Sequence, residues 1–225
     1  MLHGACHCGD THGARVPPVV PEYTSTKDRS AYARTLWEQA ADPQGTAVEV
    51  YLRGRGINIS SPFSLRFHEA LIHKGSGRHL AAMVAAVTRW PGDQVAGIHR
   101  TYIKPDGSGK ADVYPNKMSL GPISGGAVRL GSPAHEMAVS EGIEDGMTVL
   151  QETGMVVWAA TGASSLRSMV LPDLPMAAEV VVCSHPDPIG QRAASAATER
   201  WISEGRSVRV AVPEDGMDFN DVLRG

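Results

Sequence analysis

The sequence contains no long hydrophobic run and very little cysteine. Among its 225 residues 42% are hydrophobic and 20% are charged, yet no stretch approaches the ~18 uninterrupted apolar residues that a membrane-spanning helix needs. Residues 1–10 lack an apolar segment followed by small residues, so we expect no export signal. Three cysteines are too few to hold a domain of this size together by disulfides, which favours the reducing cytoplasm. We therefore expect a cytoplasmic globular protein without membrane contact.

An ATPase loop and internal repeats are also missing. Lys110 follows the Gly-Ser-Gly segment 107–109, but the residue six positions before it is Lys104, and Ala111 follows in place of Ser or Thr. This spacing does not fit a phosphate-binding Walker loop. The sequence therefore encodes no helicase motor.

Charge is divided unevenly along the chain. Residues 1–130 carry 15 Lys and Arg against 10 Asp and Glu, whereas residues 131–225 carry 6 against 14. A basic half beside an acidic half is typical of proteins that contact nucleic acid with one side and collect metal with the other. Two solvated surfaces of different sign would give the same numbers, so charge alone does not decide.

Hydrophobic periodicity predicts different architectures in the two halves. The first half reads as helices followed by antiparallel strands, at 28–39, 46–53, 83–88, 95–103 and 127–130. The second half alternates apolar strands with helices, at 137–140, 143–150, 156–160, 164–169, 179–183, 192–204 and 208–212. This alternation indicates a parallel sheet covered on both faces, and hence an α/β fold class.

Acidic residues follow the carboxyl ends of three predicted parallel strands. Glu141 and Asp145 follow 137–140, and Asp187 follows 179–183. After 208–212 come Asp215, Asp218 and Asp221. Chemistry in open parallel sheets lies beyond these ends, and converging carboxylates repel unless a hard cation such as Mg²⁺ neutralises them. Each acid could instead stabilise a helix N-terminus by about 0.3–1 kcal/mol without any metal.

The ordered set of segments resembles the Toprim domain of bacterial and phage-type primases, topoisomerases and overcoming-lysogenization-defect nucleases. The matching residues are Glu141-Gly142-Ile143-Glu144-Asp145, the strand leading to Asp187 and Gly190, and Asp218-Phe219-Asn220-Asp221. Over about 28–225 the chain is similar to primase-like Toprim proteins of phages, plasmids and proteobacterial mobile elements. The additional matching segments are Tyr51 to Ile57, His99 to Tyr102, and Lys117 to Pro122.

The resemblance implies a two-part fold and an activity. It implies a primase-core-like, mixed α+β basic subdomain at 25–131 and a C-terminal Toprim domain at 132–225, with a parallel sheet flanked by helices. The implied activity is metal-dependent nucleotidyl or phosphoryl transfer on single-stranded DNA, as in primer synthesis for replication of a phage or mobile element. Nucleoside triphosphates would be substrates, Mg²⁺ or Mn²⁺ the cofactor, and a separate replicative helicase a partner.

The resemblance also assigns roles to the acids. It makes Glu141, Asp145 and Asp187 catalytic, and it makes Glu141, Asp187, Asp218 and Asp221 metal ligands, with Asn220 or Asp221 as the companion of Asp218. One departure matters, because His185 stands where the family has the first acid of an Asp-x-Asp motif. Imidazole binds Mn²⁺ or Zn²⁺ but is a poor partner for Mg²⁺, so we expect a weakened site in which His185 itself is a candidate ligand.

Basic residues of the first half are candidates for binding nucleic acid or nucleotide. Arg100 and Lys117 occupy places similar to the basic strand and the lysine of primase cores. The further candidates are Arg53, Arg55, Lys104 and Lys110. Arg53 and Arg55 also end a predicted helix, where cations suit the helix dipole without any ligand.

The first 24 residues form a predicted flexible segment. They contain a crowded set of zinc-ligand types, namely His3, Cys6, His7, Cys8 and His12. A structural zinc site takes four ligands from two separated pairs, so this single cluster favours a zinc-ribbon remnant and makes bound zinc unlikely.

Two other functions fit the same acids. A Toprim nuclease would cut nucleic acid and would need no basic wall. A catalytically degenerate Toprim protein would bind DNA or a partner without chemistry, and His185 favours that alternative.

Overall fold

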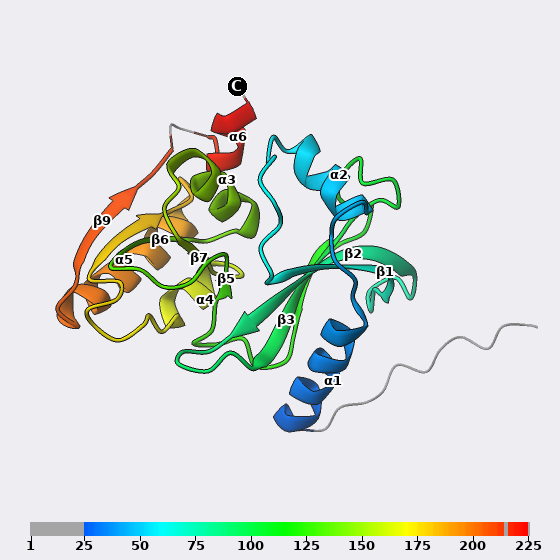
Figure 1. Ribbon diagram of the computed structural model, residues 1–225, viewed down its shortest axis with the longest axis horizontal. Coiled ribbons are helices and arrows are strands. Elements are labelled where there is room, and N and C mark those ends of the chain that lie inside the picture. Colours follow the sequence, from blue (N-terminus) through cyan, green and yellow to red (C-terminus); the bar gives the residue numbers. More distant parts are fainter. Residues whose placement is uncertain (1–24, 214–215, 225) are drawn as a thin grey trace, which may run out of the picture.

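The computed structural model describes residues 25–213 and 216–224. The predicted flexible segment 1–24, with its candidate zinc ligands, and Asp215 therefore lie outside the described residues. Two sheets stand side by side, each with its own helices (Figure 1). No helix in the described ranges combines the length and the apolar character needed to cross a membrane.

The first half is an antiparallel sheet with two helices. Its strands follow one another in the order β1-β2-β3-β4. The elements are α1 (Thr26–Gln39), α2 (Ala47–Gly54), β1 (Leu65–Ile72), β2 (His79–Thr88), β3 (Val95–Tyr102) and β4 (Lys117–Leu120). The predicted hairpin is present, because β2 and β3 pair antiparallel around the turn that contains Trp90 and Pro91.

Helix α2 begins as its sequence predicts. The Thr46 hydroxyl accepts a hydrogen bond from the Val48 amide at 3.2 Å, and Glu49 accepts one from the Gly45 amide at 2.5 Å. These contacts satisfy amides that a helix start otherwise leaves without partners. The cap fixes the start of the helix that carries Tyr51 into the interior.

Strand alternation divides the residues of β3 between two faces. Ile98 and Tyr102 pack against Ala33 and Leu36 of α1. Because successive side chains point to opposite faces, Arg100 shares the α1 face, while His99 and Thr101 point the other way. The face that carries His99 is the one turned toward the second half.

The second half is a mostly parallel sheet in the order β5-β7-β6-β8-β9. Only β5 runs antiparallel to its neighbour, β7. The elements are β5 (Val128–Arg129), β6 (Glu136–Ser140), α3 (Ile143–Thr153), β7 (Val157–Ala159), α4 (Ala163–Ser168), β8 (Glu179–Cys183), α5 (Pro188–Ser203), β9 (Ser207–Ala211) and α6 (Phe219–Arg224). The predicted α/β class is confirmed. Strands β1 and β4 and helix α6 are elements that the ranges predicted from periodicity do not include.

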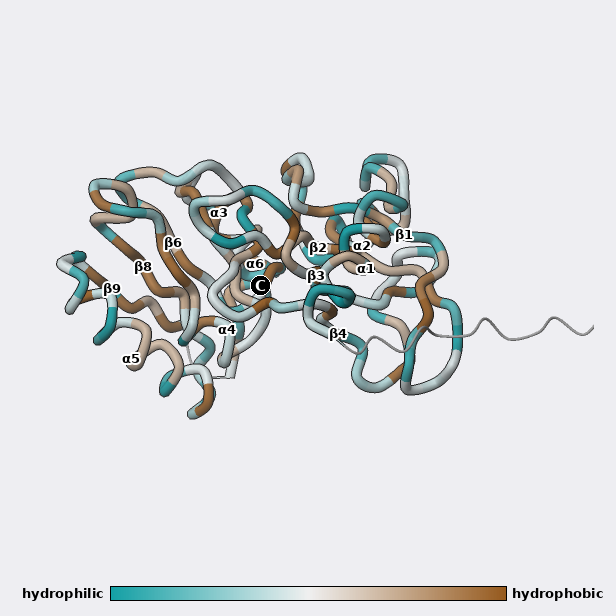
Figure 2. The backbone as a smooth tube through the Cα atoms, turned by 90° about the horizontal axis from the view of Figure 1, so that it is seen from below, coloured by the Kyte–Doolittle hydropathy of each residue, from teal (hydrophilic) through white to brown (hydrophobic). Residues whose placement is uncertain are grey.

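Helices cover both faces of this sheet. On one face α3 packs on β6 and β7 and contacts α6, and on the other α4 and α5 pack together with α5 on β8 and β9. Trp158 and Trp201 are buried in the core on the α5 face. Strands β6 and β8 are hydrophobic along much of their length, as expected for strands that are buried on both faces (Figure 2).

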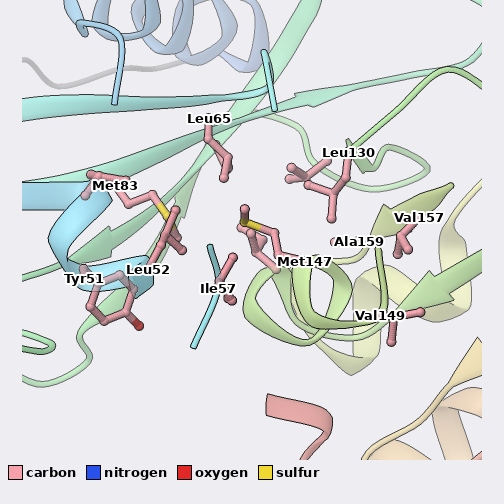
Figure 3. Packing of buried hydrophobic residues seen from close by; sticks show 14 of the residues in the cluster. Tyr51, Leu52, Ile57, Leu65, Met83, Leu130, Met147, Val149, Val157 and Ala159 are labelled. Carbon is pink, nitrogen blue, oxygen red and sulfur yellow. The ribbon is translucent and has the colours of Figure 1, made fainter. Parts of the chain in front are cut away.

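One hydrophobic core joins the two halves. Tyr51, Leu52 and Met83 of the first half belong to the same buried cluster as Met147 and Val157 of the second (Figure 3). The relative position of the two sheets is thus fixed by close packing and not by a linker.

The shared core predicts cooperative unfolding of both halves. Met147→Ala removes a side chain with 0% exposure, and such truncations cost about 2–5 kcal/mol. Urea unfolding should show one transition by circular dichroism and by tryptophan fluorescence, shifted to lower urea in the variant. Ile202→Ala, at a position 54% exposed, is the control and should cost under ~0.5 kcal/mol. Separate transitions for the two probes would contradict a shared core.

Candidate functional site

Glu141 lies directly after β6, with one carboxylate oxygen left without a partner. Its Oε2 atom is buried and accepts no hydrogen bond within the described residues. A Cβ atom added to Gly190 would lie 2.9 Å from that oxygen, so the start of α5 closes against the carboxylate. Burial raises the pKa of Glu141, the nearby His185 lowers it, and the charges of Asp187 and Asp145 raise it further. Such an atom is suited to a cation or a donor supplied by a ligand.

His185 bridges toward the two acids of the Glu-Gly-x-x-Asp segment. Its Nε2 atom lies 2.7 Å from Asp145 Oδ2, and its Nδ1 atom lies 3.9 Å from Glu141 Oε1. The hydrogen bond with Asp145 raises the pKa of His185 to about 9, against the opposing effect of burial. The imidazole is therefore charged at neutral pH and acts as a counter-ion for Asp145, which is 4% exposed.

Asp187 is both the N-cap of α5 and an exposed acid just beyond the carboxyl end of β8. Its Oδ1 atom accepts hydrogen bonds from the amides of Ile189 at 2.8 Å and Gly190 at 3.0 Å. These bonds lower its pKa. Asp187 lies on the same side as Glu141, because its charge acts on that carboxyl. The structure thus gives Asp187 the capping role and leaves it available to a ligand.

The terminal acids start α6. The Asp221 amide donates to Asp218 Oδ1 at 2.6 Å, and the Asp218 amide donates to Asp221 Oδ2 at 3.4 Å. The charge of Asp218 contributes to raising the pKa of His185. Both carboxylates are therefore engaged at the start of α6, and Asp218 is near enough for its charge to act on His185.

Asn220 connects the two halves. It is 0% exposed. Its Oδ1 atom accepts from Arg55 Nε at 2.7 Å, and its Nδ2 atom donates to the Arg55 carbonyl at 2.8 Å and to Thr148 Oγ1 at 3.0 Å. The backbone N–H of Asn220 donates to Asp145 Oδ1 at 3.3 Å. Arg55, a candidate for nucleic-acid binding, is thus tied to the Asp145 side of the site.

The buried Glu144 side chain is a second contact between the two halves. The Tyr51 hydroxyl donates to Glu144 Oε1, and Lys117 Nζ donates to Oε2, each at 2.9 Å. Burial raises the pKa of Tyr51, and the adjoining Glu144 charge raises it further. Sequence reasoning did not select Glu144 or Tyr51 as site residues, although both stand inside the segments that carried the resemblance.

A cleft lies between β3 and β4 on one side and the loop after β6, which carries Glu141, on the other. Its volume is about 350 Å³. The lining residues are His99, Lys117, Met118, Ser119, Glu141, Gly142, Ile143, Ala160, Thr161, Gly162 and His185. Burial and the charge of Lys117 lower the pKa of His99 to about 4, so this wall presents a neutral imidazole beside a lysine. Sequence reasoning also missed His99.

Three other basic candidates do not line the cleft. Arg100 is 5% exposed and donates to the Met118 and Ser119 carbonyls from the α1 face of β3. Alternation along the strand turns Arg100 away from the cleft, so its role in binding nucleic acid stays a prediction. Arg53 is paired with Glu49 at the surface. Lys104 lies in the turn after β3, where its charge acts on Asp106.

The carboxylates suit a hard cation only in part. Within residues 25–213 and 216–224, no three His, Cys, Asp or Glu side chains are grouped closely enough to hold a metal ion by themselves. Glu141, with its unpartnered oxygen, and the exposed Asp187 nevertheless fit a cation that takes one or two carboxylates and completes its shell with water and phosphate. His185 holds Asp145 away from that role.

The His185–Asp145 pair predicts lower stability at alkaline pH. The pKa of His185 rises from 6.5 to about 9 on folding. Its contribution is therefore complete below pH 6.5 and is lost as pH rises through 9. Urea unfolding from pH 6 to 10 should show the wild-type advantage over His185→Gln shrinking by about 2 kcal/mol. Parallel curves for the two proteins would contradict a charged His185.

The Toprim family pattern matches residues 136–225. A domain of unknown function, DUF7146, matches residues 27–130. No curated protein matches the sequence.

Solved primases share the fold. The Escherichia coli primase catalytic core has 15% identity and a TM-score of 0.54, with 88% of this chain and 75% of that chain covered. A DNA primase domain from Pseudomonas aeruginosa has 15% identity and a TM-score of 0.53, with 88% and 74% covered. A DnaG primase catalytic domain bound to single-stranded DNA has 15% identity and a TM-score of 0.50, with 88% and 75% covered. The expected resemblance is confirmed: residues 136–225 match the Toprim domain, and the chain has the fold of primase catalytic cores.

Proposed function

We propose that this protein is a primase-type nucleotidyltransferase that acts on single-stranded DNA. The observation that carries the proposal is the cleft in which Lys117, from the antiparallel sheet, faces Glu141, from the parallel sheet. A cation-bearing wall opposite a carboxylate-bearing wall suits a substrate with phosphates on one side and a metal-bound reacting group on the other. The solved primase that carries single-stranded DNA supports the choice of nucleic acid.

The residues divide the work by their chemistry. Glu141 and Asp187 would hold Mg²⁺ or Mn²⁺, which neutralises phosphate charge and activates the attacking hydroxyl when bound. Lys117 binds phosphate oxygens of the nucleoside triphosphate as a point charge. The hydrogen bonds between Asn220 and Arg55 fix the position of the acidic side of the site relative to the basic side. Replication of a phage or mobile element, with a separate helicase, is the setting that the sequence resemblance predicts.

A catalytically degenerate DNA-binding protein is the second candidate. The observation that favours it is the 2.7 Å contact between His185 and Asp145, because it occupies an acid and adds a cation where a dication would otherwise bind. A nuclease, the third function expected from sequence, is distinguished by its product.

Primer synthesis tests the proposal directly. The protein is incubated with single-stranded template, nucleoside triphosphates and Mg²⁺ or Mn²⁺. New short RNA is the expected product. Glu141→Gln should lower its rate at least ~100-fold, since it removes charge from the atom placed to act on the reacting group. Glu152→Gln, on the exposed side of α3, is the control and should leave the rate unchanged.

Each alternative outcome has a clear meaning. Shortened template would favour the nuclease, and template binding without product would favour the degenerate protein. Full activity of Glu141→Gln would remove Glu141 from the site.

His185→Asp should strengthen binding of a divalent cation. The substitution adds a carboxylate, releases Asp145 and removes a positive charge, and affinity for hard cations rises with the charge of the ligands. Mn²⁺ binding measured by electron paramagnetic resonance should tighten by about tenfold or more, and Mg²⁺-dependent synthesis should rise with it. His185→Gln, which removes the imidazole without adding an acid, is the matched control. Equal affinity in the two variants would show that position 185 does not contact the cation.

A further inference from the structure

Glu144 is a buried carboxylate that belongs to one half and is bound by the other. Its side chain is 5% exposed, whereas that of Lys117, its partner at 2.9 Å, is 34% exposed. It extends from α3 to contacts on α2 and β4, through Tyr51 and Lys117. The charges of Lys117 and Lys110 hold the pKa of Glu144 well below its usual range, against the effect of burial. Glu144 is therefore ionised at neutral pH.

Two lysines act on Glu144, and one of them lines the cleft. Lys117 lines the cleft opposite Glu141. Lys110 is near both groups. Burial and the charge of Lys117 lower the pKa of Lys110, and the charge of Glu144 raises it. Glu144 thus interacts with two ammonium groups, and that of Lys117 lines the cleft.

A carboxylate in this place changes what the lysines offer to a ligand. An ammonium group has three donors, and Glu144 takes one donor of Lys117. Because Glu144 is buried, its charge acts on the cleft through protein and not through water, so it is poorly screened. A phosphate that approaches Lys117 meets an ion pair and not a free cation.

We propose that Glu144 limits the affinity of the cleft for phosphate by competing for Lys117. The inference rests on the proposed function in identifying a nucleoside triphosphate as the natural source of that phosphate, with the template backbone as the other source. It gives Glu144 a role in setting substrate affinity that is separate from its contribution to docking the two halves. Weak binding of phosphate before the reaction favours release of product after it.

Glu144→Gln separates the charge from the packing. A glutamine can accept from Lys117 through its carbonyl oxygen and can donate its amide hydrogen to the Tyr51 oxygen. The variant therefore keeps the shape and both hydrogen bonds while it removes the negative charge.

The experiment measures binding by isothermal titration calorimetry without turnover, with two probes. Inorganic tripolyphosphate represents the nucleotide, and a single-stranded oligodeoxynucleotide represents the template. Glu144→Gln should bind tripolyphosphate about tenfold more tightly than wild type, because one unit of nearby opposing charge is removed. Glu152→Gln, which removes the same charge from an exposed position of the same helix, should change the affinity less than about twofold.

The gain in affinity for tripolyphosphate should depend on Lys117. The double variant Glu144→Gln with Lys117→Met restores the net charge of wild type, and its affinity should fall back to within about threefold of the wild-type value. A gain for the oligodeoxynucleotide alone would support the competition and name the template as the phosphate source.

Unchanged or weaker binding of both probes by folded Glu144→Gln would overturn the proposal. Should that variant not fold, Glu144→Asp keeps the charge but shortens its reach to Lys117, and it should tighten tripolyphosphate binding by about two- to threefold. No gain there would overturn the proposal equally. Failure of wild type to make primers would reject the proposed function but would leave this result standing.

Discussion

A buried carboxylate determines how the two halves of this protein fit together. Removing an ionised group from water costs several kcal/mol unless good partners replace the water. Glu144 has such partners only when α2 and β4 of the first half approach α3 of the second half. The same approach brings Leu52 and Met83 into one core with Met147. Polar pairing therefore selects the docking geometry and apolar burial stabilises it, and the cleft follows as the space left between Lys117 and Glu141.

The position of the acids could be predicted from the sequence because parallel strands end at one edge of a sheet. Glu141 and Asp187 follow neighbouring strands, β6 and β8, and the charge of one acts on the other. What the sequence could not supply is the partner of each acid. The contact between His185 and Asp145 spans 40 positions, and that between Tyr51 and Glu144 spans 93. Local patterns carry no information about pairs so far apart in the chain.

Strand alternation explains where the basic residues of β3 lie. Alternation along 95–103 places His99 and Arg100 on opposite faces, but it does not say which face is turned toward the acids. The face with Ile98 and Tyr102 is covered by α1, so Arg100 is used inside the first half and His99 reaches the cleft. Helix α6 was missed for a different reason. Its start depends on the reciprocal bonds of Asp218 and Asp221 and not on an apolar stripe.

Both walls of the cleft carry their own counter-ions. On the acidic side the charged His185 offsets Asp145, and on the basic side Glu144 offsets Lys117. The field across an empty cleft is therefore weaker than the uneven charges of the two halves suggest. A ligand that brings phosphate and a cation together can exchange partners with both pairs, since each new contact replaces an existing one of similar strength. Selectivity then rests on geometry, because a ligand must reach Lys117 and Glu141, which line the same cleft, at once. A lone anion or a lone cation satisfies only one wall, so the cleft suits the metal-bound nucleotide of the proposed function better than either component alone.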